Sequence, residues 1–402
     1  MSDLHVAVAL DGAGWHPAAW REPNARPADL FSAAYWVDLA QQAEAGLLDF
    51  LTIEDSFGLQ SKHYGPAEHR TDQVRGRLDA VLIAARVAPK TSNIGLVPTA
   101  LVTHTEPFHI SKAIATLDYV STGRAGVRVQ VSARADENAH FGRRAIPELQ
   151  LTDQQSPPVV ALIAELFGEA TDYVEVVRRL WDSWEDDAEI RDVATGRFID
   201  RDKIHYIDFA GEYLSVKGPS IVPRPPQGQP LVTALAHSTV PYRFAATSGD
   251  IVYVTPTDAA SAADIVGEVR SEQQAAGRGG ETVHVFGDLV VFLDTPAESG
   301  AARLHRLNDV DGAAYTSDAL IFTGSAGELA DLLADWQTAG LSGYRLRPGA
   351  LPDDLAGITE QLVPELQARG LFRRSYQAST LRGLLGLARP ANRYAITEGA
   401  LA

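Results

Sequence analysis

The sequence predicts an α/β fold, a (β/α)8 TIM barrel with insertions at the C-terminal face. Short apolar segments that suit β-strands alternate with amphipathic helical segments along the 402 residues. Such alternation is typical of a parallel sheet whose strands are joined by crossover helices. Eight strand segments are present, which is the number that closes a barrel of this kind. An open doubly wound sheet is the alternative that the alternation also allows.

The predicted strands are short and mostly apolar. The longest covers residues 283–293 and is apolar enough to be buried on both faces, as a parallel strand is. The other seven are predicted at residues 5–10, 50–53, 93–97, 126–132, 231–235, 251–254 and 344–346.

Helical periodicity separates most of these strands. In residues 30–46 apolar side chains recur at a spacing of four, which places them on one face of a helix. A later helix opens with a capping box formed by Ser325 and Glu328 and closes at Gly340. Further helices are predicted at residues 77–87, 106–119, 172–184, 241–247 and 355–369.

Two segments, residues 133–170 and 185–230, are too long for ordinary connections. We expect both to be insertions at the carboxyl ends of the strands, where the active sites of such barrels lie. No clear linker divides the chain, so a single domain spanning residues 1–402 is predicted. The Pro- and Gly-rich stretch 218–230 is the best candidate for a boundary, and a loop packed over the barrel mouth explains it equally well.

The composition excludes several classes of protein. There are 52 acidic and 35 basic residues, and the formal charge of −17 argues against nucleic acid or an anionic membrane surface as a partner. Cysteine is absent, which excludes disulfides and thiolate metal sites. No apolar run is long enough to span a bilayer, and the first residues lack the pattern of a signal peptide. We therefore expect a cytoplasmic protein.

Several common cofactor and nucleophile motifs are missing. A dinucleotide fingerprint that began at Gly12 and Gly14 would need a third glycine where Pro17 stands. The chain has no H-E-x-x-H zinc motif and no G-x-S-x-G nucleophile elbow. We predict no nicotinamide site and no catalytic metal.

Polar residues follow the second and third strands, at the end of a barrel where catalysis takes place. Glu54 and Asp55 close the second strand, so their carboxylates are placed at the mouth, and capping of the next loop is the other interpretation. Thr103 and His104 lie in the loop after the third strand. His104 is the candidate catalytic acid or base near neutral pH, with a loop-orienting role as the alternative.

Two further positions carry polar groups that packing alone does not explain. Arg128 and Gln130 alternate with valines on the fourth strand, and polar side chains inside a barrel indicate a polar ligand or a buried network. Ser238 comes directly before a helix, where a hydroxyl serves either as an N-cap or as part of an anion site.

Ordered motifs from the N-terminal region to the tail resemble one branch of a known family. They are similar to the luciferase-like flavin-dependent monooxygenases of the nitrilotriacetate and dibenzothiophene-sulfone type. The match to the family's A-W-R-x-P and F-D-x-x-F-L-A-D-S motifs is partial, and two later segments are close to verbatim. The matching segments are residues 18–23, 49–56, 94–124, 180–188, 211–219, 223–228 and 363–394.

The resemblance implies a function as well as a fold. Members are barrels that bind FMN at the carboxyl ends of the strands. A separate flavin reductase supplies FMNH2, O2 adds to give a flavin peroxide, and a small organic substrate is oxygenated. The protein shields that chemistry from water and orients the substrate. The resemblance also implies a homodimer or tetramer.

Family positions can be carried over onto this chain one by one. Asp55 occupies the position of a flavin-contacting aspartate, and Thr103 that of the hydroxyl beside the isoalloxazine. Ser238 and Thr239 match the residues that receive the FMN phosphate before a helix. Ser132 is the last residue of the family's strand-four motif G-W-N-x-V-T-S.

Three departures from the family pattern concern the same site. The flavin-facing Asn of strand four is Arg128 here. His237 replaces or shifts a close-approach position, and Pro241 removes a Gly of the same motif. A Tyr that often reaches the phosphate aligns roughly with Phe167, which has no hydroxyl. Arg128 and His237 would either add positive charge toward a reduced flavin or fill the pocket.

Three functions therefore remain open. They are an FMNH2-dependent monooxygenase, an oxidoreductase that uses a deazaflavin, and a binding or assembly protein without flavin. The substrate is not defined, although Trp15, Trp20, Phe57 and the pair His63-Tyr64 form either an aromatic wall at the mouth or a packed patch. An aromatic or heterocyclic molecule is the expected substrate.

Overall fold

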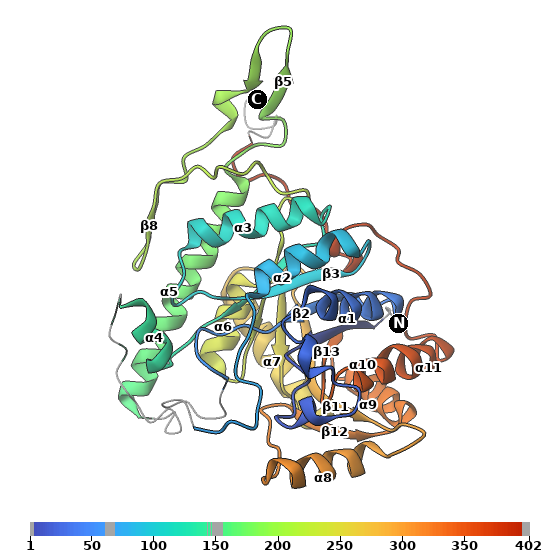
Figure 1. The fold of residues 1–402 in the computed structure, drawn as a ribbon. Coiled ribbons are helices and arrows are strands. Elements are labelled where there is room, and N and C mark those ends of the chain that lie inside the picture. The colour runs from blue at the N-terminus through green and yellow to red at the C-terminus, as the bar shows by residue number, and fades with distance from the viewer. Residues whose placement is uncertain (1–3, 61–68, 143, 145, 147–155, 396–402) are drawn as a thin grey trace.

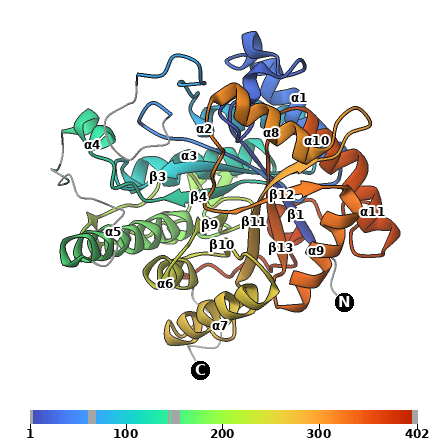
Figure 2. The ribbon, with the colours of Figure 1, turned by 90° about the horizontal axis from the view of Figure 1, so that it is seen from below.

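The protein is a closed barrel of eight parallel strands surrounded by helices (Figures 1 and 2). It is seen in a computed structural model that describes residues 4–60, 69–142, 144, 146 and 156–395. Each strand pairs in parallel with its neighbours, and the last pairs with the first. In ring order the strands are β1 (His5–Leu10), β2 (Phe50–Ile53), β3 (Gly95–Leu101), β4 (Gly126–Gln130), β9 (Leu231–Leu235), β10 (Ile251–Val254), β11 (His284–Leu293) and β13 (Gly343–Pro348). The predicted (β/α)8 barrel is confirmed.

One parallel strand was not predicted. β12 (Leu320–Gly324) pairs with the second half of β11, Leu289 to Leu293, while β10 pairs with the first half of β11. It lies beyond the barrel ring and is only partly buried. Its apolar run within the strand, Leu320 to Phe322, is shorter than the roughly four to eight residues that indicate a buried strand.

The helices pack outside the strands and run back toward the strand amino ends. The predicted capping box is present, because Ser325 accepts the Glu328 amide and Glu328 accepts the Ser325 amide. α7 and α8 were not predicted, since few of their side chains are apolar and buried. The helices are α1 (Ala33–Ala45), α2 (Ala80–Val87), α3 (Pro107–Val120), α4 (Ala135–Phe141), α5 (Pro157–Asp182), α6 (Thr239–Ser248), α7 (Ala259–Ala275), α8 (Gly300–Asp311), α9 (Ala326–Thr338), α10 (Asp353–Gly357), α11 (Val363–Ala368) and α12 (Leu381–Leu384), with a π-helical turn at Ile358–Leu362.

The two long connections both belong to the excursion between β4 and β9. The first begins at the carboxyl end of β4, as expected, and its described part includes α4 and the start of α5. α5 then carries the chain back, so the second segment lies at the opposite end of the barrel from the one predicted. It forms the hairpins β5 (Glu189–Asp192) with β6 (Arg197–Ile199), and β7 (Phe209–Ala210) with β8 (Ser215–Val216). Figure 1 shows the first hairpin projecting at the top, far from α8.

The C-terminal tail closes the amino-terminal end of the barrel. Leu381 and Leu385 are buried against Phe50 and Phe286 in the lowest layer of the barrel interior. His284, at the start of β11, approaches the carbonyl of Leu385 at 3.0 Å through Nε2. A ligand of the barrel must therefore enter at the carboxyl ends of the strands. Among the described residues, no helix combines the length and apolar character that a membrane span requires.

Candidate active site

Charged side chains fill the barrel interior above the apolar layer. Asp288 of β11 is fully buried and receives both Arg345 and Arg347 of β13. The Arg345 Nε lies 2.7 Å from the Asp288 carboxylate, and the Arg347 Nε lies 3.0 Å from it. A sequence signal for this network exists, because Asp288 interrupts an otherwise apolar strand and a buried charge needs a partner.

Glu54 connects this network to β4. It lies 3.2 Å from Arg345 and 3.2 Å from Arg128, and only 8% of it is exposed. Burial alone would raise the pKa of Glu54, but the guanidiniums of Arg128 and Arg345 outweigh that effect and hold the pKa below its usual range. Glu54 is therefore a carboxylate at neutral pH, and its position at the end of β2 makes it part of the site's charge balance.

Arg128 is held firmly but incompletely satisfied. Its Nη1 donates to Thr99 at 3.1 Å and to Gln130 at 2.6 Å, in addition to the ion pair with Glu54. Its Nε is buried and has no hydrogen-bond partner among the described residues. A buried donor without an acceptor is costly, so this atom indicates a place where a ligand acceptor would be stabilised.

A second network joins the loops after β2, β3 and β4. The Ser132 amide donates to Thr103 Oγ1 at 3.0 Å, and the Ser132 hydroxyl donates to Glu137 at 2.5 Å. Glu137, on α4, also accepts from the Ser56 hydroxyl at 2.6 Å. Glu137 is almost fully buried, and the sequence did not predict it as a site residue. It stands in a short helix between Asp136 and Asn138, and nothing in this polar run marks one residue as inward-facing.

His104 lies beside the same network. Its ring stacks on Phe141 with centroids 5.1 Å apart and planes 2° apart, and it meets Phe57 edge-on at 6.3 Å. Only 5% of the residue is exposed. The site thus places the imidazole in an aromatic environment near Thr103, its chain neighbour.

Asp55 is turned toward α2. It accepts the Ala80 amide at 2.9 Å and the Ser56 amide at 2.7 Å, so it fixes the loop after β2 against that helix. Burial raises the pKa of Asp55 to about 6, against the two amide hydrogen bonds, which lower it. The capping interpretation accounts for these contacts, and the raised pKa makes Asp55 able to exchange a proton near neutrality.

His237, Ser238 and Thr239 lie at the rim, where β9 leads into α6. His237 contacts Thr255 at 3.0 Å and Asp318 at 3.3 Å, and 44% of its side chain is exposed. Ser238 is the N-cap residue of α6, yet its side chain makes no capping hydrogen bond. Thr239 donates to Glu268 at 2.6 Å. The rim therefore presents a hydroxyl at a helix N-terminus that does not cap the helix within the described residues.

Seven of the eight predicted site residues fall into two groups, and Arg128 lies in the interior network with Glu54. Thr103, His104 and Ser132 are brought together by the Glu137 network, with Asp55 on the loop next to it. His237, Ser238 and Thr239 form the second group at the rim. His237 is linked to Arg128 by a chain of ion pairs through Asp318, Arg347, Asp288, Arg345 and Glu54. In the described part of the chain, no three His, Asp or Glu side chains gather to hold a metal ion.

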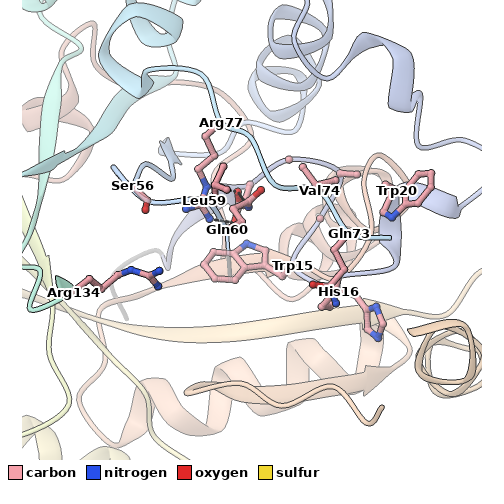
Figure 3. A pocket seen from close by; sticks show the side chains of 15 residues that line it. Trp15, His16, Trp20, Ser56, Leu59, Gln60, Gln73, Val74, Arg77 and Arg134 are labelled. Atoms are coloured by element: carbon pink, nitrogen blue, oxygen red, sulfur yellow. Dashed lines mark hydrogen bonds and ion pairs between the residues drawn. The ribbon is translucent and has the colours of Figure 1, made fainter. Parts of the chain in front are cut away.

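A cavity of about 200 Å³ opens at the carboxyl ends of β1, β2 and β4 (Figure 3). Its wall comes from the loop that follows β1, the loop that follows β2, the segment before α2, and Arg134. Trp15 and Trp20 are part of it, so two members of the predicted aromatic wall line a cavity. None of the eight predicted site residues does. His63 and Tyr64 lie outside the described residues.

Sequence comparisons identify the family. The family model described as luciferase-like monooxygenase matches residues 13–315. N-acetyl-S-(2-succino)cysteine monooxygenase of Bacillus subtilis (strain 168) is 30% identical over 454 residues, covering 98% of each chain. Nitrilotriacetate monooxygenase component A of Aminobacter aminovorans is 27% identical and covers 97% of each chain. Dibenzothiophene-sulfone monooxygenase of Rhodococcus erythropolis is 27% identical, covering 92% of this chain and 93% of its own.

Solved structures show the same fold. A long-chain alkane monooxygenase superposes with a TM-score of 0.81 at 24% identity, covering 96% of each chain. A riboflavin lyase solved with modified FMN and riboflavin gives a TM-score of 0.81 at 24% identity, covering 98% of each chain. The barrel is thus of the kind found in these enzymes. The chain belongs to the luciferase-like monooxygenase family, which makes it an oxidoreductase of the monooxygenase class.

Proposed function

We propose that this protein is a cytoplasmic, FMNH2-dependent monooxygenase of a small organic substrate, supplied with reduced flavin by a separate reductase. Family membership supports the reaction class. The observation that carries the flavin proposal is the buried Nε of Arg128, which has no acceptor among the described residues. A flavin ring offers carbonyl and nitrogen acceptors that suit such a donor.

The chain's own residues fit the two ends of FMN. Ser238 and the first turn of α6 would hold the phosphate, because a hydroxyl that makes no capping hydrogen bond and the amides of a helix N-terminus favour an anion. Arg128 and Thr103 would contact the ring, and Arg128 replaces the neutral family asparagine with a positive charge that favours an anionic reduced flavin. Asp55, Ser132 and His237 would position these contacts.

When bound, reduced flavin supplies the electrons that activate O2. The protein's task is then to exclude water and to hold the substrate. Leu381 and Leu385 of the tail close the amino-terminal end of the barrel, and ion-paired side chains fill the interior above them. A substrate would therefore enter at the carboxyl ends of the strands. His104, shielded by Phe141 and Phe57, is the proposed group that holds or releases a proton beside the substrate.

An anaerobic titration of the purified protein with reduced FMN tests the proposal. We expect saturable binding of one flavin per chain, and oxidation of a bound substrate only after O2 is admitted to the complex with reduced FMN. Reduced deazaflavin binding more tightly than reduced FMN would instead make the protein a deazaflavin oxidoreductase. If neither flavin binds, the proposal fails and a binding or assembly role replaces it.

A further inference from the structure

The cavity beside the proposed flavin site carries its own recognition chemistry. Its wall includes two guanidiniums, Arg77 and Arg134, and one carboxylate, Asp11. Figure 3 shows Arg77 and Arg134 pointing from two sides toward the space next to Trp15. The formal charge of the wall is therefore positive by one, although the whole chain carries a charge of −17.

The guanidinium of Arg77 is held in place through two of its nitrogen atoms, Nε and Nη2, which leaves Nη1 for a ligand. Its Nε lies 3.1 Å from Asp11 Oδ1 and its Nη2 lies 2.6 Å from Asp11 Oδ2, which is a bidentate pair. Its Nη1 makes no hydrogen bond to the described part of the chain, and 22% of the side chain is exposed. Asp11 is itself held by Gln60 at 3.0 Å. Because the pair fixes the guanidinium, little entropy is lost when Nη1 binds an acceptor.

Arg134 adds charge from the opposite wall. Its guanidinium makes a bidentate pair with Asp136, at 3.1 Å through Nε and 2.7 Å through Nη2. Its Nε also lies 3.8 Å from Glu137, and neither Asp136 nor Glu137 lines the cavity. The wall of the cavity therefore contains the Arg134 guanidinium without its carboxylate partners, and the Arg77–Asp11 pair with both members.

The indole rings define the rest of the ligand. Trp15 donates its Nε1 to the Ala9 carbonyl at 3.4 Å, and Trp20 donates its Nε1 to the Asp72 carbonyl at 3.0 Å. Arg347 lies 4.6 Å from the centre of the Trp15 ring and fixes its orientation. Both N–H groups are used, so the rings offer apolar surface to a planar ligand. The volume of about 200 Å³ is below the range of roughly 300–1,000 Å³ that holds drug-sized molecules.

We propose that this cavity binds a small aromatic carboxylic acid, with the carboxylate at Arg77 Nη1 and the ring against Trp15. That the acid is the substrate of the enzyme rests on the proposed function, whereas the binding itself does not. The ligand carboxylate accepts from Arg77 Nη1, and Arg134 is the second cation in a wall that contains one carboxylate, Asp11.

Calorimetric titration of the flavin-free protein with phenylacetate and with phenylacetamide tests the inference, because the two probes differ in charge and hardly in shape. We expect the acid to bind about tenfold more tightly than the amide, as a charge-assisted hydrogen bond does relative to a neutral one. Arg77→Met should remove this preference. Arg86→Met, which removes an exposed arginine from α2, should leave it unchanged.

Loss of Arg77 leaves Asp11 without its ion pair and could unfold the loop. The double variant Asp11→Asn/Arg77→Met avoids the unpaired charge and should show the same lost preference. Equal affinities in the wild type, no binding of the acid at millimolar concentration, or a preference that survives in both variants would overturn the inference. Reduced-FMN binding by the same variants is expected to match the wild type, so a failure of flavin binding is recognised separately.

Discussion

At the scale of single residues, Arg128 decides whether the altered strand-four motif still serves a flavin. We expect Arg128→Ala to weaken binding of reduced FMN by several-fold or more, since it removes the buried donor and a positive charge. Arg243→Ala, which deletes an exposed arginine that pairs with Glu272 on α7, is the matched control. Anaerobic fluorescence titration measures both affinities. An unchanged affinity in Arg128→Ala would show that Arg128 belongs to the interior network only.

Asp55 makes a prediction about pH. Its folded pKa of about 6 lies above the usual 3.8, so the folded state holds this proton more tightly than the unfolded state. Stability is then lost as pH rises between about 4 and 6, by at most about 3 kcal/mol, and is constant above that range. The free energy of unfolding of the wild type, minus that of Asp55→Asn, should fall over this window. A difference that does not change with pH would mean that Asp55 titrates normally.

At the scale of elements, the helix α6 differs from α9 in how its first turn is used. Ser325 caps α9 in a capping box, so Ser325→Ala should cost about 1 kcal/mol of stability and leave flavin binding unchanged. Ser238 makes no cap contact, so Ser238→Ala should leave stability unchanged and weaken flavin binding. Thermal denaturation and flavin titration of both variants measure the two effects. The opposite pattern would mean that Ser238 is only structural.

The sequence predicted elements well where apolar residues follow a clear period. All eight barrel strands were found, because most are short apolar runs and the others alternate apolar with polar residues. The largest displacement is at β3, which begins two residues and ends four residues later than predicted. α8 was missed because buried Arg303 pairs with Asp354, so a polar residue occupies an inward position. The second insertion was placed at the wrong end because the full length of α5, which reverses the chain, was not apparent from residues 172–184.

From the sequence, site residues were predicted only where a family motif or the end of a strand marks the position. Thr103, Ser132 and Asp55 do lie in the loops after β2, β3 and β4, and whether they contact a cofactor stays a prediction. Glu137 could not be found, because its role arises from a fold-dependent meeting of Ser56 and Ser132. The cavity was anticipated only through its tryptophans, since the Arg77–Asp11 pair joins residues 66 positions apart.

At the scale of the whole molecule, the C-terminal tail packs against the amino-terminal end of the barrel, at the opposite end from the proposed site. Leu381 is fully buried, and an added Cβ on Gly95 of β3 would lie only 2.5 Å from it. Leu381→Ala should therefore cost about 2–5 kcal/mol, the range for a buried leucine. Leu82→Ala, at a 69% exposed position, is the control. Urea denaturation gives both values, and a loss below 1 kcal/mol in Leu381→Ala would mean that the tail packs loosely.

The net charge of the whole chain and the charge of the cavity wall have opposite signs. The charge of −17 disfavours anionic surfaces as partners, while Arg77 and Arg134 place two guanidiniums in the wall of the cavity. A single domain with one mouth is the organisation that we infer from this arrangement, and a homodimer or tetramer remains a prediction.

A crystal structure of the protein grown anaerobically with reduced FMN tests the central claim most directly. The account predicts the phosphate at Ser238 and Thr239, the ring in contact with Arg128 and Thr103, and the cavity at Trp15 left open beside it. Flavin density elsewhere on the molecule, or none at saturating concentration, would contradict the account.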